Sequence, residues 1–243
     1  MKGLDIVLKD VSYERRALSY DLPVKTGCVG WWYLGGSLER SAVNLADGYP
    51  DATIIGAPTV SAAYLTLKSS NHYLRTQLRL GAAWTLGVVA RTDDTLAAGA
   101  NQPILIGTSG ESAGGNIYHT SNAANTAMNS FQSDGAETQT VAGTPGAANV
   151  WKMIIASADA AAQTIANMSA GAANTEPQDP VGGPLIPSTL TVGIGSGGQN
   201  NSFGGTSQIA WACIYNRVLS SGERTAIYDR VKAYLARRGI TGL

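Results

Sequence analysis

A short glycine-rich motif is the first place where the sequence could carry covalent chemistry. Gly110, Ser112 and Gly114 fit the G-x-S-x-G pattern of a nucleophile elbow, directly after an apolar run at 103–107. An elbow needs a helix after its turn, and then an acid and a histidine further along the chain. Here the residues after Gly114 read as a strand, and His119 follows with no carboxylate in between. The sequence therefore predicts that Ser112 is a loop serine rather than a nucleophile.

A second motif matches a nucleotide-binding turn. Gly193, Gly195 and Gly198 have the G-x-G-x-x-G spacing of a dinucleotide-binding site. Such a turn binds pyrophosphate because a helix begins immediately after it. The residues at 199–202 do not start a helix, so we predict a plain glycine-rich turn.

The charged and histidine residues show no metal-binding pattern. Neither histidine has the spacing of a metal ligand, and the acidic pairs in predicted loops are Asp47 with Asp51 and Asp93 with Asp94. Loop carboxylates can hold calcium, but aspartate is also a common turn residue. The turn role is the favoured reading, so we expect no metal, no cofactor and no catalytic residue.

The best-defined elements lie at the C-terminal end. Residues 209–215 alternate large and small side chains, which is typical of a strand buried on at least one face and places Ile209, Trp211, Cys213 and Tyr215 on the same side. Ser220 and Glu223 form an S-x-x-E capping box, which predicts a helix over 221–238. Gly239 suits the left-handed position after a helix. The apolar stripe of this helix has a 3.6-residue period and consists of Ile227, Val231, Tyr234 and Leu235.

Most of the remaining chain reads as short strands joined by turns. Residues 63–76 predict a hairpin around a Ser-Ser-Asn turn. Residues 84–91 predict a central strand in which Trp84, Leu86, Val88 and Ala90 face inward. Residues 151–155 and 163–168 predict a second pair of strands; the alternative for the Ala-rich stretch 159–168 is one or two helical turns. Further strands are predicted at 29–34, 53–55, 102–107, 116–119, 127–132 and 189–194. The sequence therefore predicts one all-β sandwich.

Overall composition restricts the possible partners. The chain has 243 residues, with 17 Lys and Arg against 17 Asp and Glu. This balance gives no net field to attract nucleic acid or an anionic membrane. No apolar run approaches the ~20 residues that span a bilayer, and the N-terminus carries acids among its apolar residues, unlike a secretory signal. We expect no nucleic-acid partner and no membrane insertion.

Several of these segments resemble one superfamily. The stretches 27–35 (GCVGWWYLG), 63–76, 84–91 (WTLGVVAR) and 209–240 are similar to the strands and closing helix of the concanavalin A-like lectin/glucanase superfamily. The similarity is to its laminin G-like form, common in bacteriophage virion structural proteins. It implies an antiparallel two-sheet jelly-roll sandwich over 27–243, an extended N-terminal arm over 1–26 and one C-terminal α-helix.

The resemblance also implies a function. Glucanase members place a nucleophile and an acid on one strand as E-x-D-x-x-E, and no glutamate here is followed by aspartate two residues later. A non-enzymatic virion structural protein of a tail fibre, baseplate or capsid surface is therefore implied, with a lectin-like domain that contacts host-surface glycans. It would be assembled in the host bacterial cytoplasm and lie on the virion surface. The alternatives are a soluble secreted lectin, or a polysaccharide-active or esterase enzyme.

Cys28 and Cys213 fall on the predicted first and last core strands. These strands are often neighbours in the superfamily, so a disulfide bond is geometrically possible. Two buried, unbridged thiols are the favoured reading, because free cysteine is among the most buried residue types.

The first 26 residues are denser in charge than the rest of the chain. We expect this arm to bind other virion proteins by adding a strand to an exposed sheet edge, in a chain that forms homo-oligomers. The alternative is an edge strand folded on its own sandwich. The predicted assembly residues are Leu4, Ile6, Leu8 and Tyr13.

Ligand contacts are expected in the loops at 107–115, 171–188 and 195–205, because glycine-rich loops can approach a partner closely. An exposed aromatic ring can also stack on a sugar. The predicted core tryptophans are Trp31, Trp84, Trp151 and Trp211, and the aromatic residues that could be exposed are Trp32, Tyr64, Tyr73 and Tyr118. The predicted ligand-binding residues are Asn174, Gln178, Gln199, Asn200, Asn201, Trp32 and Tyr118.

Overall fold

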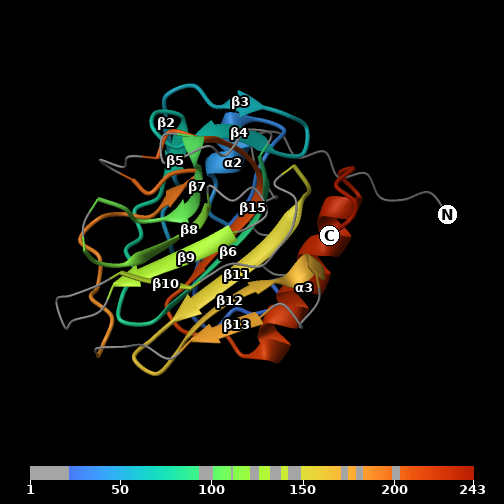
Figure 1. The fold of residues 1–243 in the computed structure, drawn as a ribbon. Coiled ribbons are helices and arrows are strands. Elements are labelled where there is room, and N and C mark those ends of the chain that lie inside the picture. The colour runs from blue at the N-terminus through green and yellow to red at the C-terminus, as the bar shows by residue number, and fades with distance from the viewer. Residues whose placement is uncertain are drawn as a thin grey trace.

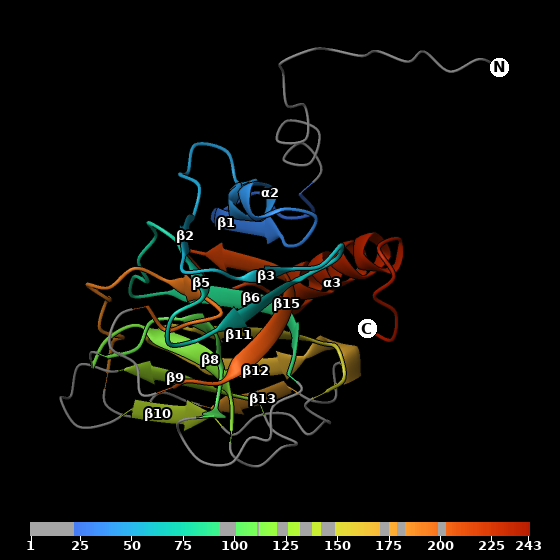
Figure 2. The same cartoon turned by 90° about the horizontal axis from the view of Figure 1, so that it is seen from above.

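Two antiparallel β-sheets stack face to face, and one long helix packs on the outer face of the first sheet (Figures 1 and 2). The computed structural model describes residues 22–92, 101–110, 112–120, 126–131, 138–141, 149–170, 175–178, 183–198 and 203–243. The prediction of an all-β, two-sheet sandwich with a C-terminal helix is confirmed.

The first sheet carries the helix. Its strand order is β13 (Thr175–Gln178), β12 (Gln163–Asn167), β11 (Lys152–Ala158), β6 (Trp84–Arg91), β15 (Thr206–Tyr215), β4 (Leu65–Lys68) and β3 (Thr59–Val60), with β1 (Cys28–Tyr33) also pairing with β15. The predicted pairing of the strands at 151–155 and 163–168 is confirmed by the β11–β12 register.

The second sheet faces away from the helix. Its strand order is β10 (Thr138–Val141), β9 (Thr126–Phe131), β8 (Gly115–His119), β7 (Ile104–Gly107), β14 (Gly193–Ile194), β5 (Tyr73–Arg75) and β2 (Thr53–Ile55). The predicted hairpin at 63–76 is wrong in one respect. A single β-bridge between Lys68 and His72 closes the turn, but β4 continues in the first sheet and β5 in the second.

The space between the sheets is filled by alternate residues of their strands. On β6, Trp84, Leu86 and Val88 point inward, whereas Val89 points to the outer, helix-covered face. Both faces of this strand are buried, which explains why its residues before Arg91 are apolar apart from Thr85.

A bulge in β15 changes which residues face the helix. The register against β6 shifts between Ile209 and Trp211. Because one extra residue reverses the alternation, Ile209 faces the other sheet while Trp211, Cys213 and Tyr215 lie under the helix. The sequence pattern alone placed Ile209 on the same face as Trp211, and that prediction is wrong.

Helix α3 (Ser221–Ala236) is capped at both ends as its sequence predicts. The Ser220 side chain accepts from the Glu223 amide, and the Glu223 carboxylate accepts from the Ser220 amide at 2.9 Å. At the other end Gly239 has φ of 84°, and the Ile240 amide donates to the Leu235 carbonyl at 3.0 Å. This bond belongs to a Schellman ending, and the helix is two residues shorter than the predicted 221–238.

The sequence also missed some regular structure. A five-residue helix, α2 (Leu38–Ala42), is capped by Ser37, whose side chain accepts from the Arg40 amide. Residues 175–178, predicted as part of a loop, form β13 and pair with β12. The strand predicted at 189–194 is reduced to the two residues of β14.

The two cysteines form no disulfide bond, which agrees with the favoured interpretation of the sequence. Both thiols are free and buried on neighbouring strands β1 and β15. Burial raises the pKa of Cys28 to about 12 and the pKa of Cys213 well above its ordinary value. A thiol that stays protonated is a poor nucleophile and a poor metal ligand.

The packed region begins before Gly27. Val24 is buried under the helix side of the first sheet, and its carbonyl accepts from the Tyr215 hydroxyl at 2.9 Å. Arg217 donates through Nε to the Thr26 carbonyl at 2.9 Å. The predicted assembly residues Leu4, Ile6, Leu8 and Tyr13 lie outside the described residues.

Candidate functional site

The G-x-S-x-G motif does not form a hydrolase site. Ser112 is exposed in a turn, and the strand β8, not a helix, follows Gly114. His119 lies at the far end of β8 with its ring buried, 3.4 Å from the Thr126 hydroxyl. The serine and the histidine are thus separated by the length of the strand, whereas a catalytic pair must be within hydrogen-bond reach.

Gly195 and Asp51 have structural roles, whereas Asp93 and Asp94 lie outside the described residues. Gly195, with φ of 80°, turns the chain after β14. The Asp51 carboxylate accepts from the Asn44 amide at 2.9 Å, as a turn residue does. Within the described ranges, no group of three or more His, Cys, Asp or Glu is placed to hold a metal ion.

Of the seven predicted ligand-binding residues, the structure describes Trp32, Tyr118 and Gln178, which lie on three different strands. Trp32 is wholly buried between the sheets, so its predicted exposure is wrong. Gln178 is a strand residue of β13. The residues that lie outside the described part of the chain are Asn174, Gln199, Asn200 and Asn201.

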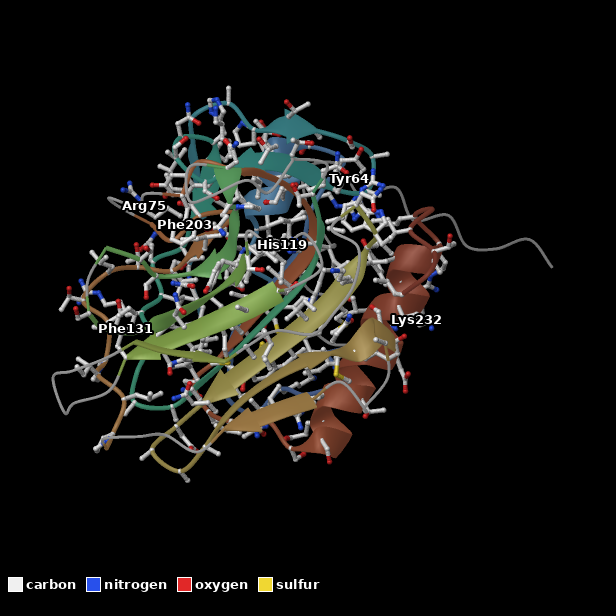
Figure 3. All side chains as sticks on the ribbon, in the orientation of Figure 1. Tyr64, Arg75, His119, Phe131, Phe203 and Lys232 are labelled. Carbon is white, nitrogen blue, oxygen red and sulfur yellow. The ribbon has the colours of Figure 1, made fainter. Side chains whose placement is uncertain are left out.

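Tyr118 is partly exposed on the second sheet. Its ring packs edge-on against Phe203, with the centroids 5.5 Å apart. Figure 3 labels Phe203 on the side of the molecule away from helix α3. Tyr118 thus remains a candidate for ligand contact, but it is already in contact with another ring.

A second group of aromatic and polar side chains lies on the outer face of the first sheet. It consists of Tyr64, Arg91, Trp151 and Gln208, and we call it the Arg91 cluster. Each member is partly exposed. Figure 3 labels Tyr64 near the C-terminal end of α3, where Arg238 donates to the Ala62 carbonyl.

Strand register brings the cluster together. Gln208 of β15 is directly opposite Arg91 of β6. Trp151 immediately precedes Lys152, which is opposite Ala90 on β6, so Trp151 lies beside Arg91. Tyr64 immediately precedes β4, which pairs with the first part of β15. Four strands far apart in sequence therefore supply one continuous surface.

The guanidinium of Arg91 is the centre of this surface. Its Cζ lies 4.9 Å from the ring centroid of Trp151 and 5.9 Å from that of Tyr64. Its Nε donates to Gln208 Oε1 at 2.6 Å. The two rings also contact each other, with centroids 5.4 Å apart and planes inclined by 57°. Cation–π attraction and one hydrogen bond hold the guanidinium in place.

The helix determines where this surface can be reached. Helix α3 covers the same face of the sheet at Val89, Trp211 and Cys213 through its stripe of Ile227 and Val231. The Arg91 cluster lies beyond the end of that cover, because Arg91 is two residues past Val89 on the same face of β6. Val150, next to Trp151, is half exposed. The cluster can therefore offer aromatic rings and polar donors to a ligand.

Lys152, whose pKa is strongly shifted, lies close to the Arg91 cluster in sequence but does not belong to it. Lys152 is buried, and desolvation lowers its pKa to about 8. It faces the space between the sheets, on the same side of β11 as Ile154, and so points away from the Arg91 cluster. A separate hollow of about 250 Å³ is lined by Arg79, Thr189, Leu190 and Thr191.

Sequence reasoning missed the Arg91 cluster. Trp151 was predicted to be a core residue, and it is partly exposed. One signal was present, because Arg91 and Gln208 are polar residues at the ends of otherwise apolar strands. Their meeting depends on strand register, which the sequence pattern did not specify.

Comparison with known proteins gives a likeness of fold. No protein-family model matches the chain, and a search of curated proteins finds no match. Among solved structures, the chain is similar to the binding domain of botulinum neurotoxin DC in complex with SialylT, with a TM-score of 0.64 at 11% identity over 85% of this chain and 52% of that one. It is also similar to the botulinum neurotoxin serotype D binding domain, with a TM-score of 0.60 at 12% identity over 85% of this chain and 52% of that one.

The chain thus spans about half the length of these relatives. A third similar structure is of botulinum neurotoxin type C, whose cell entry is dependent upon interaction with two ganglioside molecules. Its TM-score is 0.59 at 10% identity, over 86% of this chain and 52% of that one. At such identities the likeness shows a shared β-sandwich fold.

Proposed function

We propose that this chain is a non-enzymatic, lectin-like domain that binds glycans through the Arg91 cluster. The observation that carries the proposal is the placement of Arg91 against two partly exposed rings, Tyr64 and Trp151, on an open part of the sheet. Aromatic rings stack on the C–H faces of sugars, while Arg and Gln side chains hydrogen-bond to their hydroxyl groups.

The fold comparison supports binding over catalysis. The similar structures are named as receptor-binding or binding domains of neurotoxins, and one of them is named in complex with SialylT. The G-x-S-x-G motif, the one esterase-like motif of the sequence, has its serine and the following histidine at opposite ends of β8. An esterase is therefore the less favoured function.

We further propose that the chain belongs to a bacteriophage virion, in a tail fibre, baseplate or capsid-surface component. This proposal rests on the resemblance of four stretches of the sequence to laminin G-like virion proteins. In this setting the glycan would belong to the host surface, and the chain would be assembled in the host bacterial cytoplasm. The N-terminal arm would join it to other virion proteins or to its own copies.

A glycan array with two matched variants tests the binding function. We expect Trp151→Ala to weaken binding at least about tenfold, because it removes the larger ring of the cluster. Tyr118→Ala, which truncates an aromatic residue on the opposite sheet, should leave binding unchanged. The reverse result would place the site on the second sheet, and an array with no bound glycan would refute the lectin function. Release of reducing sugar or acyl groups would show an enzyme instead.

Purified particles test the virion proposal. Mass spectrometry should find the chain in particles, and a chain that starts at Leu22 should fold with unchanged stability but fail to join them. Leu22 is the better starting point than Gly27, because Val24 and Thr26 are bonded to the sandwich. A chain found only free in the medium would favour a secreted lectin, and unfolding of the shortened chain would make residues 1–21 part of the domain.

A further inference from the structure

We infer that the Arg91 cluster selects an acidic glycan, and that the Arg91 guanidinium binds the carboxylate of a uronic or sialic acid. This inference rests on the proposed glycan-binding function and goes beyond it by specifying the ligand class. It is carried by the geometry of the guanidinium and by the donors that this geometry leaves free.

The first observation is that Arg91 is held in advance of binding. Two rings contact the guanidinium, and Gln208 Oε1 accepts from Nε at 2.6 Å. Gln208 is the residue opposite Arg91 in the sheet, so its position is fixed by the backbone ladder. A side chain that is already ordered loses little rotamer freedom when a ligand binds.

The second observation is that most of the donors of Arg91 are unused. A guanidinium has five N–H donors, and Gln208 takes the one on Nε. Within the described part of the chain, neither Nη atom has a hydrogen-bond partner and Arg91 has no carboxylate partner. The residue is nevertheless only partly exposed. Its two Nη groups therefore form a positive, planar edge to which an anion can bind.

The chemistry of this edge favours a carboxylate. Two parallel N–H groups match the two oxygens of a carboxylate, and the resulting bonds are about twice as strong as neutral ones. Among the described residues, the side chains in contact with Arg91 do not compete for this edge, because Tyr64, Trp151 and Gln208 are all uncharged. One guanidinium balances the single charge of a carboxylate, whereas a phosphate monoester carries about −2 at neutral pH.

The rings favour a sugar as the carrier of that carboxylate. Tyr64 and Trp151 are inclined to each other by 57°, so they present two differently oriented surfaces beside the cation. A pyranose acid has both a carboxylate and an apolar C–H face within one ring. Both can therefore contact the cluster together, since a contact with Arg91 places the sugar over the neighbouring rings.

Arg79 provides an internal comparison. It is an exposed arginine that lines the hollow with Thr189, Leu190 and Thr191. That hollow contains no aromatic residue among its lining side chains. The structure thus offers two arginines next to possible ligand surfaces, of which only Arg91 is flanked by aromatic rings. Arg79→Gln therefore removes the same charge from the molecule without altering the proposed site.

Isothermal titration calorimetry with two pairs of probes tests the inference. The probes are an oligoglucuronate and a sialyllactose, each compared with its methyl ester, which keeps the sugar but removes the charge. We expect the wild-type chain to bind at least one acid about tenfold or more tightly than its ester. Which acid binds identifies uronic or sialic acid as the source of the carboxylate. That preference should weaken as salt is raised.

The variants separate the charge from the geometry. Arg91→Gln should bind acid and ester equally, Arg91→Lys should lose most of the preference because it lacks the planar fork, and Arg79→Gln should keep it. Urea denaturation of each variant checks that it folds. If a variant does not fold, the comparison of acid with ester on the wild-type chain still tests the inference. Equal binding of acid and ester by the wild-type chain, or a preference that survives Arg91→Gln, would overturn the inference while leaving glycan binding intact. Binding of neither form, together with an empty glycan array, would refute the proposed function itself.

Discussion

Replacing Glu223 by Gln tests how helix α3 is fixed to the sandwich. The Glu223 carboxylate accepts from the Ser220 amide within the helix and from both Nη atoms of Arg217, at 3.0 and 2.5 Å. Arg217 in turn donates to the Thr26 carbonyl at 2.9 Å. The ion pair thus joins the start of the helix to the segment before β1. A glutamine at position 223 keeps the capping reach but removes the charge.

The pKa of Glu223 gives the size of the expected loss of stability. The Arg217 hydrogen bonds, followed by the Ser220 amide, lower it from 4.5 to about 2. A pKa difference of about 2.5 corresponds to about 3.4 kcal/mol at 1.36 kcal/mol per unit. Both side chains are 30% exposed, so solvent screening reduces this to about 1 kcal/mol. For a chain of this size that change lowers the melting temperature by about 2–4 °C.

Urea denaturation of wild type and Glu223→Gln from pH 7 to pH 2 is the assay. The folded-state pKa is depressed, so the carboxylate contributes its stabilisation fully above about pH 4.5 and loses it as the pH falls towards about 2. The difference between the two proteins should therefore be about 1 kcal/mol at pH 7 and should vanish near pH 2. Asp229→Asn, on an exposed part of the same helix, is the control and should change little. A constant difference at all pH values would refute the role assigned to the charge.

Two further predictions concern buried groups. The Gln163 side chain is wholly buried, and within the described residues neither amide atom has a hydrogen-bond partner. Gln163→Leu should therefore raise the free energy of unfolding by about 1–3 kcal/mol in urea denaturation. The control is Asn167→Leu, which should lower the free energy of unfolding, because Asn167 Oδ1 accepts from the Ser169 backbone amide. A lower free energy of unfolding for both variants would contradict the reasoning. Cys28 and Cys213 should react with a thiol reagent only after unfolding, so rapid labelling of the native protein would show that this face opens.

Features specified by neighbouring residues were predictable from the sequence. The capping box of Ser220 and Glu223 and the glycine ending at Gly239 depend on residues a few positions apart, and helix α3 was located correctly. The alternation in β6 also identified which residues face inward. Local patterns of this kind constrain each element before any long-range contact forms.

Features that depend on strand pairing were harder to predict from the sequence. The bulge beside Ile209 turns this residue to the face opposite to the one that the sequence pattern predicted. Strand β13 forms where turn residues indicated a loop. Exposure was also misjudged for Trp32, Tyr73 and Trp151. Alternation shows that neighbouring residues of a strand face opposite sides of the sheet. It does not show that other elements cover both faces of β1, or that helix α3 stops covering the sheet before Trp151.

The Arg91 cluster could not be predicted from the sequence, because it depends on strand pairing. Arg91 and Gln208 are unremarkable in sequence, 117 residues apart, and become neighbours only through the register of β6 and β15. Of the loop residues chosen from composition, Gln178 lies on β13 and the others lie outside the described residues. A surface built from four strands requires the sheet topology before its chemistry can be recognised.

Tryptophan fluorescence offers the most direct measurement of the central claim. Of the five tryptophans, Trp31, Trp32, Trp84 and Trp211 are wholly buried and Trp151 is partly exposed. Acrylamide should therefore quench one fraction of the emission, and Trp151→Phe should remove that fraction. If a glycan binds at the Arg91 cluster, a saturating concentration of a glycan found by the array should protect this fraction from quenching. A glycan that binds fully yet leaves the quenching of Trp151 unchanged would contradict the account.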